Sequence, residues 1–229
     1  MPAFEGKDGM PFWQDLTTTN LLQSTNFYRE IFGWEIVDGI ARKEGLPVAG
    51  LVSAQADGWV TSFLGDADVD KYGGKVLSAD ETITLCEDPS GGLFGLKDPE
   101  ERFVAAGEPG VPVWYELVTT DQATVDFYGD LFDWEIREED GYFLAFEDGA
   151  PFLGMVVGAG AAWVSYFGVE DLAAACKTVE ELGGTVEVGP GEGPFGFMAG
   201  ITDPNGAQCF LVEVETPEFE DINEADSVL

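Results

Sequence analysis

The sequence contains no histidine. Imidazole nitrogen is a usual ligand in catalytic sites for zinc, iron, nickel and manganese, so metal sites of the mixed histidine and carboxylate type are excluded. The same absence excludes Ser/His and Cys/His nucleophile pairs. A magnesium or calcium site made only of oxygen ligands stays open, because it needs several converging carboxylates and carbonyls rather than imidazole.

Basic residues are scarce, with 10 Lys and Arg against 44 Asp and Glu, which gives a formal net charge of −34. A field of this sign repels phosphate backbones and anionic lipid. We therefore expect no nucleic acid and no membrane surface among the partners of this acidic protein, and we interpret the charge as a feature that favours solubility.

Cysteine and long apolar runs are also scarce. Cys86, Cys176 and Cys209 are odd in number and widely spaced, which favours reduced, packed thiols over disulfides. The chain has no apolar run of about 18 residues, and its first six residues do not have the basic and apolar regions of a signal peptide. These absences predict a cytoplasmic protein.

One stretch is used twice. Residues 112–136 include Trp-Tyr-Glu-Leu and then Phe-Tyr-Gly-Asp-Leu-Phe-Asp-Trp-Glu, and residues 11–36 include Trp-Gln-Asp-Leu and then Phe-Tyr-Arg-Glu-Ile-Phe-Gly-Trp-Glu. The offset is 101 residues between Pro11 and Pro112 and 100 residues between Phe27 and Phe127. Self-similarity at a fixed period predicts a tandem repeat of one structural unit.

Local patterns place the elements of each copy. A strand is expected over 12–18 and again before Asp121, followed by helices with one apolar face that end near Phe32 and Phe132. The second copy then predicts strands and one more helix, which begins after Asp171 and stops at Gly183. The later strands are expected near 142–146, 151–157, 163–169 and 208–214. An Asp-Pro-x-Gly turn precedes the last strand of each copy, at Asp88 and at Asp203.

Taken together, these motifs resemble the βαβββ module of the vicinal oxygen chelate superfamily, which includes glyoxalases, bleomycin resistance proteins and extradiol dioxygenases. The tandem copies are similar to two-module glyoxalase-like proteins of actinobacteria that are described as hydroxylases. The resemblance implies an α+β fold of two tandem βαβββ modules, each a half-open, curved mixed sheet. Its expected parts are a first module over 9–98, a linker over 99–110, a second module over 111–215 and an acidic, disordered tail over 216–229.

The first module is shorter than the second. Residue 59 to residue 88 spans 29 positions, whereas the matching interval from 163 to 203 spans 40, and the missing residues fall where the second copy has its second helix. A truncated helix leaves an apolar sheet face to be covered. We expect a loop or a second subunit to cover the face near 69–76, which makes a homodimer a possible assembly.

The resemblance also indicates where metal-using members hold their ion, on the first strand, an inner strand and the last strand. The matching positions here are Trp13 and Trp114, Val60 and Val164, and Gly95 and Phe210. None of these side chains can bind a metal, so we predict no metal and no cofactor.

Strand alternation then selects the residues of a cleft, because every second side chain faces the same side of a sheet. If Trp114 faces the cleft, so does Glu116, and Trp13 and Asp15 do the same in the first copy. The predicted ligand-binding residues are Trp13, Asp15, Trp114, Glu116, Tyr166, Phe195 and Phe210. Phe195 enters through the Gly-rich segment 189–197, which is either a lid or a plain connector. Alternatively, both Trp side chains fill the barrels and the two acids bond to neighbouring strands.

Three functions are compatible with this cleft. The first is binding of a small aromatic or cationic molecule, since aromatic rings supply contact area and cation–π attraction. The second is an enzyme of the lyase, isomerase or hydroxylase type, either independent of metal with Asp15 or Glu116 as general base, or using a metal held by oxygen ligands. The third is a scaffold whose pocket is filled.

Overall fold

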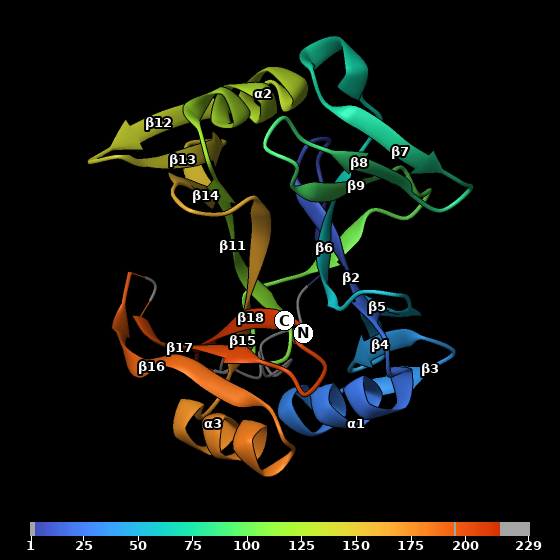
Figure 1. Ribbon diagram of the computed structural model, residues 1–229, viewed down its shortest axis with the longest axis vertical. Helices are drawn as coiled ribbons and strands as arrows, with labels where there is room; N and C mark the ends of the chain where they lie inside the picture. Colours follow the sequence, from blue (N-terminus) through green and yellow to red (C-terminus); the bar gives the residue numbers. More distant parts are fainter. Residues whose placement is uncertain (1–2, 195, 216–229) are drawn as a thin grey trace, which may run out of the picture.

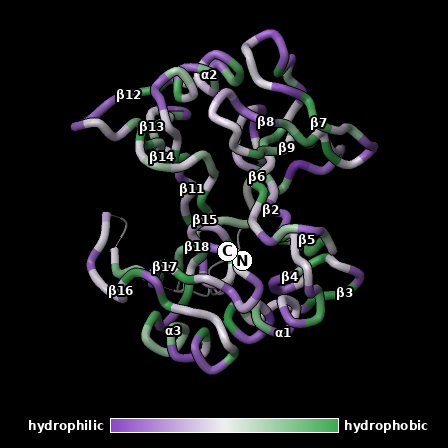
Figure 2. Tube along the Cα trace, in the orientation of Figure 1, coloured by the Kyte–Doolittle hydropathy of each residue, from purple (hydrophilic) through white to green (hydrophobic). Residues whose placement is uncertain are grey.

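The protein is built from two eight-stranded mixed sheets that stand back to back (Figure 1), and the structure, a computed structural model, describes residues 3–194 and 196–215. Hydrophilic residues are spread over the outer loops and hairpins of both sheets (Figure 2). Among the described residues, no helix is long and apolar enough to span a membrane.

The first sheet has the strand order β3-β4-β5-β2-β6-β9-β8-β7. Its elements are β2 (Pro11–Thr18), α1 (Leu21–Phe32), β3 (Glu35–Val37), β4 (Ile40–Lys43), β5 (Leu46–Ser53), β6 (Gly58–Leu64), the short 3-10 helix η1 (Val69–Tyr72), β7 (Lys75–Ala79), β8 (Thr84–Glu87) and β9 (Leu93–Lys97).

The second sheet repeats this arrangement in the order β12-β13-β14-β11-β15-β18-β17-β16. Its elements are β11 (Pro112–Thr119), α2 (Gln122–Phe132), β12 (Glu135–Glu139), β13 (Tyr142–Glu147), β14 (Ala150–Val157), β15 (Ala162–Val169), α3 (Leu172–Glu181), β16 (Thr185–Gly193), β17 (Gly196–Thr202) and β18 (Gln208–Glu213). A separate two-stranded sheet pairs β1 (Ala3–Glu5) with β10 (Phe103–Ala105). Of these two strands, β10 lies within the segment expected to be a linker.

The predicted fold of two tandem modules with open, curved mixed sheets is confirmed, and each sheet contains two successive βαβββ units. In the first sheet β2 and β6 begin the two units and pair antiparallel at the centre, while β5 runs parallel to β2 and β9 parallel to β6. The element η1 takes the place of a full helix in the second unit, as the shorter first copy predicts. The predicted tail over 216–229 lies outside the described residues.

Short polar side chains begin all three α-helices. Asn20, Asp121 and Asp171 each accept a hydrogen bond from the backbone N–H three residues later, which satisfies a donor that the helix itself leaves unpaired. The first two helices end on residues in the left-handed conformation, Gly33 and Asp133. The helices therefore begin at the residues that the sequence predicts.

Both hydrophobic cores are shared between the modules. One joins α1 with α3 and β18 of the second module, and it contains Phe27, Tyr28, Cys176, Val179 and Leu211. The other joins α2 with η1, β6 and β9 of the first module, and it contains Phe63, Val69, Phe94, Phe127 and Tyr128. In Figure 1 α2 accordingly lies beside η1 at one end of the molecule, and α1 beside α3 at the other.

Part of the face expected to be covered by a loop or a second subunit is covered by α2 instead. Val69 is only 1% exposed because it packs in the same core as Phe127 and Tyr128 of α2. The helix that covers Val69 therefore comes from the other module of the same chain, whereas Val76 on β7 is 43% exposed and its cover stays a prediction.

The repeated Phe-Tyr pair and the repeated Asp-Pro-x-Gly turn form contacts between the two modules. The hydroxyl of Tyr128, from the second Phe-Tyr pair, donates to Asp88 Oδ2 of the first Asp-Pro-x-Gly turn at 3.1 Å. Ser90 in that turn lies 2.6 Å from Thr119 Oγ1 and 2.5 Å from Thr124 Oγ1 of the second module. In the opposite direction, Asn205 of the second turn donates to Ser24 of α1 at 2.9 Å.

The Gly-rich segment 189–197 is not a loop throughout. Its pairs Gly191–Met198 and Glu192–Phe197 extend the antiparallel hairpin of β16 and β17. An irregular connector over the whole segment is therefore wrong, its role as a lid stays a prediction, and Phe195 lies outside the described residues. The three cysteines are free and buried, as predicted.

Candidate functional site

The first concave face is the open side of β2. Along this strand Trp13, Asp15 and Thr17 are half-buried, whereas Gln14 and Leu16 are buried on the opposite side against the rest of the molecule. The alternation follows from the two-residue period of a strand, as the sequence analysis assumed. Trp13 and Asp15 therefore face the same side of the first sheet.

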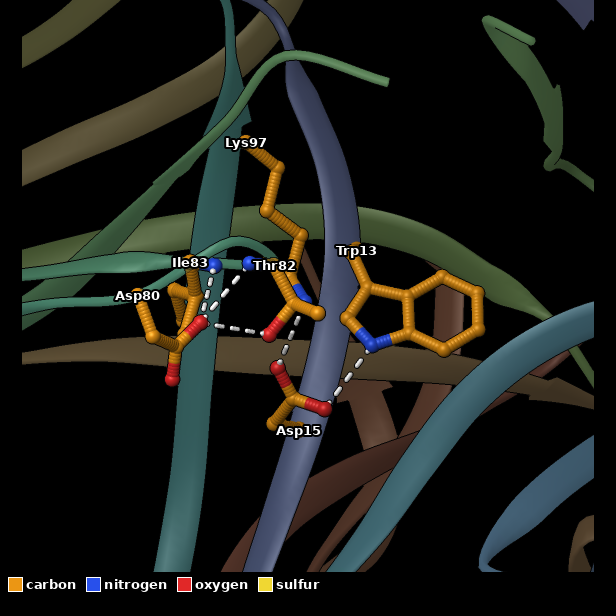
Figure 3. Close-up of polar contacts among 6 residues, drawn as sticks. All are labelled: Trp13, Asp15, Asp80, Thr82, Ile83 and Lys97. Carbon is orange, nitrogen blue, oxygen red and sulfur yellow. Dashed lines mark hydrogen bonds and ion pairs between the residues drawn. The ribbon is translucent and has the colours of Figure 1, made fainter. Parts of the chain in front are cut away.

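A hydrogen bond and an ion pair hold these two side chains in place (Figure 3). The indole Nε1 of Trp13 donates to Asp15 Oδ1 at 2.8 Å, and the ammonium group of Lys97 lies 3.4 Å from Asp15 Oδ2. The side chains of Asp15 and Lys97 are each 16% exposed, so solvent screens their attraction less than at an open surface. Lys97 also lies 5.7 Å from the centroid of the Trp13 ring, within cation–π range.

The turn between β7 and β8 forms the opposite wall (Figure 3). Asp80 Oδ1 accepts hydrogen bonds from the backbone N–H of Thr82 at 2.7 Å, from the Thr82 hydroxyl at 2.8 Å and from the N–H of Ile83 at 3.1 Å. The bonds from Thr82 and Ile83 lower the pKa of Asp80, and the turn therefore carries a fixed negative charge.

Between these walls lies a pocket of about 520 Å³. Its lining belongs to the first module and to Pro99 directly after it, and comprises Phe12, Trp13, Gly65, Asp66, Asp80–Thr84, Leu96, Lys97, Asp98 and Pro99. This volume is within the usual range for small-molecule sites. Of the charged lining residues, four are acidic and one is basic.

The second concave face is occupied by aromatic side chains of its own. Glu116 Oε2 accepts a hydrogen bond from the hydroxyl of Tyr142 at 2.7 Å, and Oε1 accepts one from Tyr166 at 3.3 Å. Burial, together with the neighbouring carboxylate, raises the pKa of both tyrosines, so both phenols stay protonated and can donate. Trp114 Nε1 lies 3.4 Å from the Tyr142 hydroxyl, which links it to the same network.

The strand register places different side chains in the corresponding rows of the two sheets. Trp114 pairs with Tyr166, which pairs with Phe210, and the last two rings stack with centroids 4.7 Å apart. The matching row of the first sheet is Trp13, Ser62 and Gly95. A serine and a glycine thus stand where the second module has two large rings, and the side chain of Ile83 lies close to Gly95.

Neither row fits a divalent metal ion. Metal sites need several converging nitrogen, oxygen or sulfur ligands, and the rows present indole, phenol, hydroxyl, phenyl and hydrogen side chains. Within the described residues no three Cys, Asp or Glu side chains converge as they would around a metal. The three positions of each row thus do not supply a metal site.

The predicted ligand-binding residues that the structure describes lie in two groups, one on each sheet. Trp13 and Asp15 lie on the first sheet, and a second group lies on the second sheet. The second group is Trp114, Glu116, Tyr166 and Phe210.

Two members of these networks, Lys97 and Tyr142, were missed from the sequence. Lys97 lies two residues after the Gly95 position and so on the same strand face, which is the signal that finds it. Tyr142 comes from a strand separated from β11 by β14 and reaches Glu116 because Gly154 between them has no side chain.

Comparison with known proteins supports the predicted family resemblance. Residues 113–209 match the model of the Glyoxalase/Bleomycin resistance protein/Dioxygenase superfamily. The chain is 27% identical to the anthracycline biosynthesis protein DauV of Streptomyces sp. strain C5, over 90% of this chain and 94% of that one. The predicted resemblance to the superfamily is thereby confirmed.

Solved structures with the same fold are more distant in sequence. A variant of homoprotocatechuate 2,3-dioxygenase from B. fuscum matches with a TM-score of 0.66 and 18% identity, over 96% of this chain and 75% of that one. The Mn(II)-bound glyoxalase from Novosphingobium aromaticivorans matches with a TM-score of 0.65 and 16% identity, over 93% and 87%. At these identities the likeness establishes the fold alone.

Proposed function

The second module of this chain belongs to the glyoxalase, bleomycin resistance protein and dioxygenase superfamily, and from that premise we propose that the protein binds a small planar aromatic molecule carrying a cationic group. The binding site is the pocket beside Trp13 on the first sheet. The observation that carries this proposal is the indole of Trp13, which Asp15 fixes at the wall of a 520 Å³ pocket.

A fixed indole favours a flat ligand. Aromatic rings stack or meet edge to face, and each such contact adds about 0.5–1.5 kcal/mol beyond the area that it buries. Because Asp15 holds the indole Nε1 and Lys97 holds Asp15, little side-chain entropy is lost when a ligand stacks on the ring.

The charge around the pocket favours a cation. Asp66, Asp80, Glu81 and Asp98 line it, and its one lysine is already paired with Asp15. Asp98 is itself paired with Arg102, which leaves three carboxylates to attract a ligand. Within a chain of net charge −34, this surrounding disfavours phosphates and other anions.

The relatives support an aromatic ligand. DauV is named as an anthracycline biosynthesis protein. DnrV of Streptomyces peucetius is also described as an anthracycline biosynthesis protein and is also 27% identical to this chain. Anthracyclines are planar, so we include this class among the ligands to be tested.

We propose that the corresponding concave face of the second sheet is closed to ligands. Both oxygens of Glu116 accept hydrogen bonds from tyrosines, and Tyr166 is stacked on Phe210. A ligand there has to displace Tyr142 or Tyr166 before it reaches Trp114. Phe195, the remaining predicted residue, stays a prediction outside the described residues.

The alternative is an enzyme that uses Asp15 or Glu116 as general base. A general base must lie within hydrogen-bond reach of the proton that it removes. Asp15 holds Trp13 and Lys97, and Glu116 holds two phenols, and this positioning role favours binding over catalysis. Steady turnover of a bound compound would support the enzyme instead.

Fluorescence titration tests the proposal. An anthracycline with a protonated amino sugar and its neutral aglycone are titrated into the purified chain. We expect the amine to bind more tightly than the aglycone, and Trp13→Leu to weaken binding about tenfold, equivalent to about 1.4 kcal/mol. Trp114→Leu, at the same position of the other module, is the matched control and retains affinity. Equal affinities of W13L and W114L would refute the assignment to the first pocket.

A further inference from the structure

A second cavity, of about 360 Å³, lies where the two modules meet. Its lining includes residues 57–59 at the start of β6 in the first module, and residues of β15, β16, β17 and β18 in the second. Its lining residues do not include Trp13, Trp114 or Glu116. It is therefore separate from the pocket beside Trp13.

Three aromatic side chains form rigid parts of its wall. Trp163 is 4% exposed and donates from Nε1 to the Tyr128 hydroxyl at 2.9 Å. Trp59 packs edge to face on Tyr28, with ring centroids 5.2 Å apart, and Phe210 is stacked on Tyr166. Because the cores hold Trp59 and Trp163, and Tyr166 holds Phe210, these rings stand in place before any ligand arrives.

An exposed apolar side chain also lines this cavity. Val188 on β16 is 59% exposed, although it stands beside the buried Ile201. A cavity with buried apolar groups on one side and an exposed valine on the other leaves apolar surface in contact with water. An apolar ligand would remove that surface from water, at about 25 cal/mol per Å² buried.

The charged groups of the lining are all acidic. Asp57 accepts hydrogen bonds from the Thr19 backbone N–H at 2.7 Å and from its hydroxyl at 3.0 Å, and Glu187 accepts one from Thr202 at 3.2 Å. Partial desolvation opposes ionisation of Asp57, but the bonds from Thr19 outweigh it and lower its pKa. No lysine or arginine is present among the lining residues.

We propose that this junction cavity is a second binding site, which takes a flat, apolar molecule carrying one amine. The rings of Trp59, Trp163 and Phe210 and the side chain of Val188 contact the apolar body, and Asp57 and Glu187 attract the amine. The site does not depend on the proposed function of the first pocket. Because both modules line it, its ligand also stabilises the contact between them, since a ligand bound only to the folded state raises its stability.

The test uses three acridines of similar shape and different charge: 9-aminoacridine, which is cationic at neutral pH, neutral acridine and anionic acridine-9-carboxylate. They are titrated into the Trp13→Leu chain, so that the first pocket does not contribute. We expect one equivalent of 9-aminoacridine to bind, acridine to bind more weakly and the carboxylate to bind least.

Two substitutions localise the site. Val188→Arg places a cation at the cavity and should weaken binding of 9-aminoacridine at least tenfold. Its matched control is Val37→Arg, because Val37 is 63% exposed on an edge strand of the other sheet, away from both cavities. Asp57→Asn should weaken binding of 9-aminoacridine several-fold and leave acridine unchanged.

Two outcomes overturn the proposal: V188R binds 9-aminoacridine as tightly as V37R, or the Trp13→Leu chain shows no saturable binding of it. Failure of the first pocket is measured separately in the Val188→Arg background, where the junction site does not contribute, and appears there as an anthracycline affinity that Trp13→Leu leaves unchanged. Circular dichroism of each variant shows whether it is folded.

Discussion

Tyr28 and Tyr128 occupy the same place in the two modules, and their hydroxyl groups lie beside corresponding Trp and Asp side chains. The Tyr128 hydroxyl accepts a hydrogen bond from Trp163 and donates one to Asp88. The Tyr28 hydroxyl faces the equivalent Trp59 and Asp203, but this hydroxyl, Trp59 Nε1 and Asp203 Oδ2 have no partner within hydrogen-bond distance among the described residues. At the scale of single residues, the repeat therefore keeps the three side chains of this network and differs in how closely they approach.

This difference predicts unequal effects of one substitution. Tyr128→Phe leaves the Trp163 N–H and an Asp88 oxygen without their partner inside the protein, and we expect a loss of about 1–3 kcal/mol in the free energy of unfolding. Tyr28→Phe removes only the longer contacts with Trp59 and Asp203 and should cost less than about 1 kcal/mol. Urea unfolding of both variants measures the difference, and a larger loss in Y28F would contradict it.

At the scale of strands, a glycine decides how the second concave face is filled. A Cβ atom added at Gly154 on β14 would lie 1.8 Å from the Tyr142 hydroxyl. The absence of a side chain on this central strand lets Tyr142 cross it and reach Glu116 on β11. In the first sheet, a Cβ atom at Gly50 would instead lie 2.2 Å from Asp15 Oδ1.

We expect Gly154→Ala to displace Tyr142 and to lower the free energy of unfolding by about 1–3 kcal/mol, as overpacking does. The emission of Trp114 should change as well, because its indole N–H then loses its neighbour. Gly158→Ala is the control, since the nearest atom to its added Cβ is Val118 Cγ1 at 3.7 Å. If G154A and G158A unfold alike, Tyr142 does not depend on this gap.

The strands and helices show what the sequence could and could not reveal. Asn20, Asp121 and Asp171 act locally on the next turn of backbone, so the helix starts were predictable. The same holds for the alternation along β2 and β11. Pairing across the sheet is not local: the contact of Tyr142 with Glu116 depends on the register of three strands, and no spacing along the chain encodes it.

The candidate site was likewise predictable only where its residues lie on one strand. Trp13 and Asp15 follow from one strand, but the pocket needs Lys97 and the turn of Asp80, which lie about 65 to 85 residues later in the chain. Packing of α2 against Val69 was also out of reach, because amphipathic helices reveal which face is buried and not what buries it.

For the whole molecule, charge predicts a dependence on salt. With 44 acidic and 10 basic residues, like-charge repulsion opposes the compact state. The Debye length falls from about 10 Å at 0.1 M to about 3 Å at 1 M ionic strength, so KCl should screen this repulsion. We expect the urea midpoint to rise between these concentrations. Sucrose at matched osmolality is the control, and a midpoint that falls in KCl would contradict the explanation.

The shared cores predict that neither half folds alone as a monomer. Residues 1–106 and 107–229 each contain one sheet, but the helix of each half is buried against the other. We expect each fragment by itself to unfold without a cooperative transition, and the mixture to recover the near-ultraviolet circular dichroism of the intact chain. Cooperative unfolding of a monomeric fragment would show that the modules are independent.

The crossed cores also bear on how such a chain could have arisen. A one-module ancestor, with rings such as Phe127 and Tyr128 on its helix, could have buried them only against a second copy, so its folding would have depended on concentration. Fusion of two copies makes that encounter intramolecular. Once fused, the halves could differ in sequence, and the second module has Tyr166 and Phe210 where the first has Ser62 and Gly95. A pair of identical copies could not have carried such a difference between its halves.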